Sequence, residues 1–197
     1  MKRAPARSAI LGLLTVSVLT AAPFGAATST GHAGTAPGYI VPVAAGSAED
    51  PATRKPMPAD LTVADGSNMP LPLAHFRGEV LLLNFWATWC APCLKEMPFL
   101  DRLQGDLKGM PLLVMEVSED KGGMPVAKAY LERAKLTFLR PFTDPNGAAA
   151  EALDVQGLPT SFIIDKDGRL VQRVEGPYEW DNPAILNRFR ALINEAP

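Results

Sequence analysis

The chain has 197 residues, 47% of them hydrophobic and 20% charged, which suits one globular domain with extra chain at an end. Its 19 basic and 21 acidic residues give a net charge of −2 with no basic run, so nucleic acid is not an expected partner. Two cysteines, Cys90 and Cys93, are too few for a disulfide-stapled scaffold.

The N-terminus has the pattern of an export signal. Lys2, Arg3 and Arg7 precede an uncharged stretch at 9–22, and small residues then dominate up to Ala33. We expect residues 1–33 to be a signal peptide or an N-terminal anchor, because the apolar stretch is short for a spanning helix. The protein is therefore expected in the periplasm, either free or tethered to the inner membrane.

Residues 34–57 are rich in Ala, Gly and Pro and show neither a strand period nor a helix period. This composition predicts a disordered tether. We therefore expect the folded domain to occupy residues 58–197.

Apolar periodicity in the domain predicts strands followed by helices, ending in a β-hairpin. The expected strands cover 61–63, 71–73, 80–86, 112–117, 138–142, 161–164 and 170–174. The expected helices follow Cys90 and cover 126–134, 148–153 and 183–194. Crossover helices imply parallel pairing and hairpins imply antiparallel pairing, so an α/β fold with a mixed central sheet is predicted.

The segment Cys90-Ala91-Pro92-Cys93 falls where a buried strand gives way to a helix. A helix N-terminus favours the thiolate form of Cys90, and Pro92 is tolerated in a first helical turn. Two intervening residues allow the sulfurs to reach bonding distance. We expect the pair to cycle between dithiol and disulfide, with Cys90 attacking a substrate disulfide and Cys93 resolving the mixed disulfide.

Other uses of the pair stay open at this point. A structural disulfide is one, although a ring of four residues constrains the unfolded chain little. Haem attachment would need a histidine directly after Cys93, but residue 94 is leucine. A Cu(I) site would need ligands in addition to the two cysteines, and the only candidates are His75, well upstream, and His32, in the signal or tether. No cofactor and no metal site are therefore predicted, and a Cu(I)-binding assembly module remains an alternative.

The segment from Asn84 to Cys93, NFWATWCAPC, resembles the active site of the thioredoxin superfamily, specifically its exported TlpA/ResA-like branch. The segment 157–160 resembles the cis-proline loop of that family, Pro98 matches its helix-kinking proline, and 176–180 resembles TlpA in particular. The resemblance implies a thioredoxin-like fold with an N-terminal β-hairpin and a helical insertion near 126–134. It also implies a thiol-disulfide oxidoreductase.

The resemblance further implies partners and a substrate surface. Clients would be disulfide-bearing proteins such as apocytochrome c or copper-site assembly factors, and a membrane thiol donor would re-reduce a monomeric enzyme. Trp89 would contact clients beside Cys90. A cis Pro159 opposite Cys90 would present the backbone of Leu158 to an extended client segment.

The sequence departs from the family at the groups that handle protons. The family's buried aspartate is replaced by Asn84, and the glutamate that some members carry between the cysteines is replaced by Ala91. Glu96 is our hypothesis for proton transfer, with Glu116 as the second candidate. An exposed helix face for Glu96 and an exposed strand end for Glu116 fit the sequence equally well.

A thiol peroxidase of the peroxiredoxin type shares this fold and is a further alternative. Its signature places a proline seven residues and a threonine three residues before the reactive cysteine. Those positions here are Leu83 and Ala87, which favours disulfide exchange over peroxide reduction.

Overall fold

The computed structural model describes residues 51–196. The predicted signal or anchor at 1–33 and the part of the predicted tether before residue 51 lie outside the described residues. Within residues 51–196, no helix has both the length and the apolar character needed to cross a bilayer.

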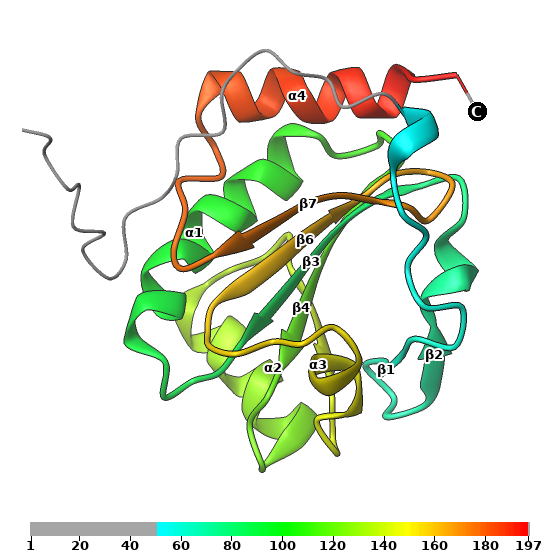
Figure 1. The fold of residues 1–197 in the computed structure, drawn as a ribbon. Helices are drawn as coiled ribbons and strands as arrows, with labels where there is room; N and C mark the ends of the chain where they lie inside the picture. The colour runs from blue at the N-terminus through cyan, green and yellow to red at the C-terminus, as the bar shows by residue number, and fades with distance from the viewer. Residues whose placement is uncertain (1–50, 197) are drawn as a thin grey trace, which may run out of the picture. The chain divides into compact units, whose positions relative to one another are not determined.

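A seven-stranded mixed sheet forms the centre of the described domain, in the order β2-β1-β5-β4-β3-β6-β7 (Figure 1). The strands are β1 Thr62–Ala64, β2 Pro70–Pro72, β3 Val80–Trp86, β4 Leu112–Ser118, β5 Arg140–Thr143, β6 Thr160–Ile164 and β7 Leu170–Glu175. Strands β3, β4 and β5 run parallel, whereas β6 and β7 and the β1–β2 hairpin pair antiparallel. The predicted thioredoxin-like α/β fold is confirmed.

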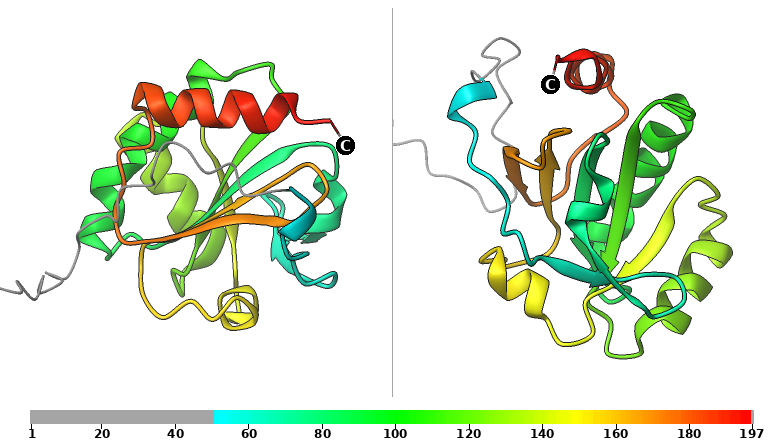
Figure 2. Two further views of the ribbon diagram at one scale, coloured as in Figure 1. Left: turned by 45° about the horizontal axis from the view of Figure 1, so that its top comes forward. Right: turned by 90° about the vertical axis from the view of Figure 1, so that its right-hand side faces the viewer.

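Helices cover both faces of this sheet. They are α1 Ala91–Asp106, α2 Gly123–Ala134, α3 Ala148–Ala152 and α4 Pro183–Asn194. In the right-hand view of Figure 2, α3 lies on one side of the sheet and α1 and α2 lie on the other. Side chains of α1, α2 and α4 share one apolar cluster with Leu82 and Trp86 of β3, while α3 belongs to the cluster on the opposite face with Leu83 and Phe85. Successive side chains of β3 point to opposite faces of the sheet, and helices cover both faces. All seven residues of β3 are therefore buried, which explains the unbroken apolar run in its sequence.

The predicted boundary at residue 57 is too late, because residues 51–57 pack against the folded domain. The backbone N–H of Met57 donates to the carbonyl of Gly168 at 3.0 Å, and the N–H of Leu170 donates to the carbonyl of Lys55 at 2.8 Å. The contact escaped sequence analysis because it is made mostly by backbone atoms, which leave no apolar period. The folded domain therefore already includes residue 51.

One buried cation holds this segment in place. The guanidinium of Arg54 lies 3.1 Å from the carboxylate of Asp165 in the β6–β7 turn and 2.6 Å from that of Glu195 beyond α4. The Arg54 side chain is 2% exposed and that of Asp165 is 7% exposed. The ion pairs thus join the N-terminal segment to the hairpin and to the C-terminal end of α4.

Replacing Arg54 with Met should destabilise the domain by about 3 kcal/mol, because it leaves the buried Asp165 carboxylate without its cation. Urea unfolding of the full chain measures this free energy. The control is Arg190→Met on the exposed side of α4, which should change stability by less than about 0.5 kcal/mol. Equal urea midpoints for both variants would show that residues 51–57 do not belong to the cooperative unit.

Candidate active site

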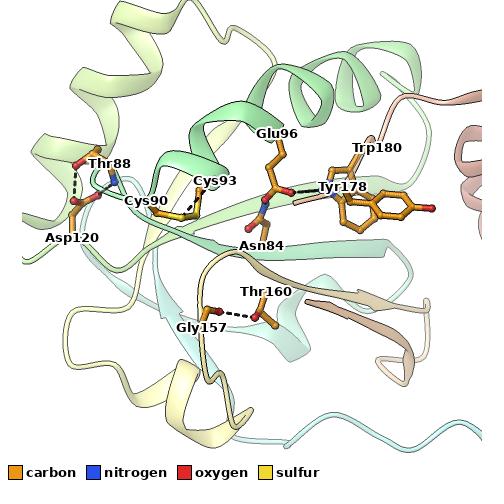
Figure 3. Close-up of a disulfide and its surroundings, with 10 residues drawn as sticks. All are labelled: Asn84, Thr88, Cys90, Cys93, Glu96, Asp120, Gly157, Thr160, Tyr178 and Trp180. Atoms are coloured by element: carbon orange, nitrogen blue, oxygen red, sulfur yellow. Dashed lines mark hydrogen bonds between the residues drawn. A yellow bond between two sulfur atoms is a disulfide. The ribbon is translucent and has the colours of Figure 1, made fainter. Parts of the chain in front are cut away.

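Cys90 and Cys93 sit at the junction between the buried strand β3 and helix α1. Cys90 caps the helix, which begins at Ala91 with Pro92 in its first turn. Its Sγ accepts a hydrogen bond from the backbone N–H of Cys93 at 3.3 Å, and the two sulfurs form a disulfide (Figure 3). The predicted placement of the pair at a helix N-terminus is confirmed.

The two sulfurs differ in their access to solvent. Cys90 is 5% exposed, whereas Cys93 is fully buried beneath the first turn of α1. Trp89, directly before the pair, is 69% exposed, and Ala91 and Pro92 are exposed as well. An incoming sulfur therefore reaches Cys90 first, between the Trp89 side chain and the start of the helix.

Pro159 lies beside the end of β3, from which the Cys90 loop departs. Thr160, the first residue of β6, pairs with Phe85, and the Leu158–Pro159 peptide bond is cis as predicted. Within residues 51–196 the N–H and C=O of Leu158 have no hydrogen-bond partner. Its side chain packs against the core, so the Leu158 backbone is held in place with its polar groups free to pair.

The loop between β3 and α1 is fastened by a carboxylate that sequence analysis missed. Asp120 accepts from the Thr88 hydroxyl at 2.7 Å and from the Thr88 backbone N–H at 2.9 Å (Figure 3). It also accepts from the hydroxyl of Ser118 at the end of β4 at 2.9 Å. An aspartate after a strand is common, so nothing in the sequence marked this one as a clamp for the loop that carries Trp89 and Cys90.

Glu96 is buried, and its reading as an exposed helix-face residue is wrong. The side chain projects from α1 toward the sheet and is 1% exposed. Its carboxylate accepts from Asn84 Nδ2 at 2.8 Å, from the Tyr178 backbone N–H at 3.0 Å and from Trp180 Nε1 at 3.4 Å. Burial raises the pKa of Glu96 to about 7, although the three hydrogen bonds act in the opposite direction.

This arrangement explains why Asn84 can stand where the resembled family has a buried aspartate. The strand position holds a neutral amide, and the titratable carboxyl comes instead from the helix one turn beyond Cys93. The segment 176–180, which sequence analysis used only as a mark of resemblance, supplies the other two donors to Glu96. Its Tyr178 and Trp180 rings pack at 4.9 Å between centroids, so two aromatic side chains lie together beside the carboxylate.

Glu116 is also buried, so its reading as an exposed strand end is wrong. It lies in β4 beside Asn84 of β3 and has no exposed surface. Burial raises the pKa of Glu116 well above its usual range, and the nearby carboxylates of Glu96 and Asp101 add to this effect. The candidate site thus contains two buried carboxyl groups, on a helix and on a strand.

Comparison with known proteins gives matches over most of the described domain. Residues 51–187 match the Redoxin family. Proteins named thiol-disulfide oxidoreductase ResA are similar, at 38% identity over 120 residues in Geobacillus kaustophilus and 34% over 117 residues in Bacillus thuringiensis. Both alignments cover 59% of this chain and 66% of the relative, slightly less than two thirds of its length.

Solved structures show the same fold. A protein described as a thiol:disulfide interchange protein DsbE, from Chlorobium tepidum, matches with a TM-score of 0.62 at 26% identity, over 72% of this chain and 98% of the other. An exposed lipoprotein thioredoxin of Streptococcus pneumoniae matches with a TM-score of 0.55 at 28% identity, over 68% of this chain and all of the other.

The raised pKa of Glu96 predicts a pH-dependent stability of the oxidised protein. The folded state holds this proton up to pH about 7 whereas the unfolded state releases it near pH 4.5, so the stabilisation present at low pH is lost as pH rises between these values. In Glu96→Gln the free energy of unfolding should therefore fall less steeply as pH rises from 4.5 to about 7, by up to about 1.4 kcal/mol per pH unit. Urea unfolding at several pH values measures it.

The matched control is Glu132→Gln on the exposed side of α2, which should keep the wild-type slope. If Glu96→Gln also keeps the wild-type slope, the carboxyl of Glu96 titrates in its ordinary range and burial does not control it.

Proposed function

This chain belongs to the Redoxin family, and from that membership and its cysteine pair we propose that it is a thiol-disulfide oxidoreductase that reduces disulfides of client proteins. The observation that carries the proposal is the difference in access within the pair, with Cys90 5% exposed between exposed neighbours at the α1 N-terminus and Cys93 fully buried one turn inside. A structural disulfide needs no such difference in access. The names of the ResA and DsbE relatives agree with the proposed chemistry.

The reaction begins with the reduced pair. The Cys90 thiolate, stabilised by the N–H of Cys93 and the positive end of α1, attacks one sulfur of the client disulfide. A bond forms between Cys90 and that sulfur, and the second client sulfur leaves as a thiolate. Cys93 then attacks Cys90 Sγ, which forms the Cys90–Cys93 disulfide and releases the first client sulfur. The client gains the two electrons that the pair loses.

The second step requires Cys93 to lose its proton, and we propose that Glu96 accepts it. Glu96 follows Cys93 by one helical turn, and both side chains lie on the buried face of α1. A carboxyl with a pKa of about 7 is suited to take and return a proton near neutral pH. Hydrogen bonds from Asn84, Tyr178 and Trp180 hold the carboxylate ready for this exchange.

The surface around Cys90 suits an extended client segment. The backbone N–H and C=O of Leu158, which have no partner among residues 51–196, support pairing with the main chain of a client as an added strand. Trp89, next to Cys90 in the chain, offers an exposed aromatic side chain. Backbone pairing accepts many sequences, so this surface recognises an exposed disulfide in a flexible segment more than a particular client.

We propose further that the protein works as a reductant in the periplasm, free or tethered to the inner membrane. The basic, apolar and small-residue pattern of residues 1–33 supports export. Clients in the assembly of cytochrome c or of the copper site of cytochrome oxidase, and a membrane thiol donor, are proposed from the family resemblance. The proposed enzyme acts as a monomer.

Trapping tests the proposed reaction. Cys93→Ser removes the resolving thiol, so this variant, expressed in the export compartment, should accumulate proteins bound through Cys90 that a reductant releases. Mass spectrometry of the released proteins identifies the clients. Cys90→Ser is the matched control and should hold none, because its remaining thiol is buried.

Wild-type protein should also reduce insulin disulfides in the presence of a thiol donor. Recovery of no mixed disulfide with the Cys93→Ser variant, together with no insulin reduction by the wild type, would exclude the proposed activity.

A further inference from the structure

Glu116 is the buried titratable group that the reaction above leaves unused. It lies at the centre of β4, has no exposed surface, and neither of its carboxyl oxygens has a hydrogen-bond partner within residues 51–196. No Lys or Arg of that range forms an ion pair with it. An ionised carboxyl in such a place would cost several kcal/mol, so the neutral acid is the form that fits the site.

A second unpartnered atom lies on the neighbouring strand. Asn84 and Glu116 are partners in the parallel register of β3 and β4, about 5 Å apart at their Cα atoms. Their neighbours two residues along, Leu82 and Val114, belong to the same core cluster under α1, so both side chains lie on the α1 face of the sheet. Asn84 Nδ2 donates to Glu96, whereas the buried Asn84 Oδ1 has no donor in the part of the chain that the structure describes.

We propose that Glu116 is kept as a neutral carboxylic acid whose O–H donates to Asn84 Oδ1, which makes it a positioning residue for Glu96 in the proposed redox site. This hydrogen bond supplies a partner for Asn84 Oδ1 and for the hydroxyl of Glu116, and leaves the carbonyl oxygen of Glu116 without a donor within residues 51–196. A hydrogen-bonded chain runs from the Glu116 O–H to the Asn84 carbonyl, and from the Asn84 N–H to the Glu96 carboxylate. The role in catalysis depends on the proposed function, whereas the protonation and the hydrogen bond do not.

The chain of hydrogen bonds has two effects on Glu96. The Glu116 O–H fixes which end of the Asn84 amide faces the helix, so a donor and not a carbonyl meets the Glu96 carboxylate. A neutral Glu116 also adds no negative charge, which allows Glu96 to ionise near neutral pH. Only one of the two buried carboxyls then exchanges a proton during turnover.

The carboxyls that face Glu116 accept hydrogen bonds and do not compete with it as donors to Asn84 Oδ1, whereas the buried Nε1 of Trp86, two residues along β3, is a further N–H without a partner within residues 51–196. From α1, Glu116 meets two carboxyls, Glu96 and Asp101, and the latter already accepts from backbone N–H groups at 138 and 139. From α2, Tyr130 packs its ring on that of Trp86. The α4 side chains in the shared core cluster are apolar.

One competing hydroxyl lies on the other side of Asn84. Ser161 of β6 is the register partner of Asn84 in the antiparallel pair and is buried. A donor from Ser161 would satisfy Asn84 Oδ1 but would leave Glu116 without a partner. The two possibilities differ in which substitution disturbs Glu96.

Infrared spectroscopy of the wild-type, full-length oxidised protein tests the protonation directly. With 13C-labelled glutamate, an isotope-shifted carbonyl band of an un-ionised carboxylic acid should persist at pH 9, where Glu96 and Glu119, each with a pKa of about 7, have ionised. Loss of every such band by pH 9 would overturn the proposal. This measurement requires no substitution and no enzymatic activity.

Carbon-13 NMR titration of Glu96 in variants tests the hydrogen bond. Glu116→Gln keeps a neutral donor, so the pKa of Glu96 should stay within about half a unit of the wild type. Glu116→Met removes the donor and frees the Asn84 amide, which should raise the pKa of Glu96 by about one unit. Ser161→Ala is the matched control and should leave it unchanged.

Two results would contradict the inference. A fall in the pKa of Glu96 in Glu116→Gln would mean that a negative charge had been removed and that Glu116 is ionised in the wild type. A rise in Ser161→Ala with none in Glu116→Met would assign the donor to Ser161. Because these titrations use the oxidised protein, failure of the proposed reductase activity would leave their outcome unaffected.

Discussion

The buried carboxyl of Glu96 is the group on which the arrangement of the site depends. A carboxylate removed from water needs hydrogen-bond donors, and here they come from Asn84 in β3 and from Tyr178 and Trp180 in the segment before α4. The same contacts hold α1 against the sheet and fold the 176–180 segment over the helix. The need of this one buried carboxyl group for hydrogen-bond donors thus joins the elements that surround Cys93.

Two further contacts hold the loop that carries Cys90 and the loop that carries Pro159. Asp120 fastens the loop before Cys90 through both polar groups of Thr88, and the loop before β6 is joined to the segment after β7 by a hydrogen bond from the Gly176 N–H to the Pro159 carbonyl. Each contact anchors a loop to the end of a strand. Cys90 is therefore presented by loops that the sheet holds in place, which limits the reorganisation needed when a client binds.

Most of the fold could be predicted from the sequence because its elements carry strong local patterns. The apolar run of β3, the helical spacing after Cys93 and the turn at 165–168 are each legible in a few consecutive residues, whichever distant elements they pack against. The cysteine pair could be predicted because its chemistry depends on residue type and spacing, whereas the cis Pro159 is expected only because the segment 157–160 resembles the loop of a known family. Burial of Glu96 and Glu116, the Asp120 clamp and the Arg54 anchor depend on residues distant in the chain, and no local pattern records them.

The rate of the second exchange step tests most directly whether Glu96 takes the proton of Cys93. Reduced protein mixed with one equivalent of an aromatic disulfide releases one thiolate when Cys90 attacks and another when Cys93 resolves, and stopped-flow absorbance separates the two phases. The rate of the second phase should rise with pH around a midpoint of about 7 in the wild type. In Glu96→Gln this midpoint should disappear and the phase should slow near neutral pH. Identical profiles for the two proteins would contradict the role of Glu96.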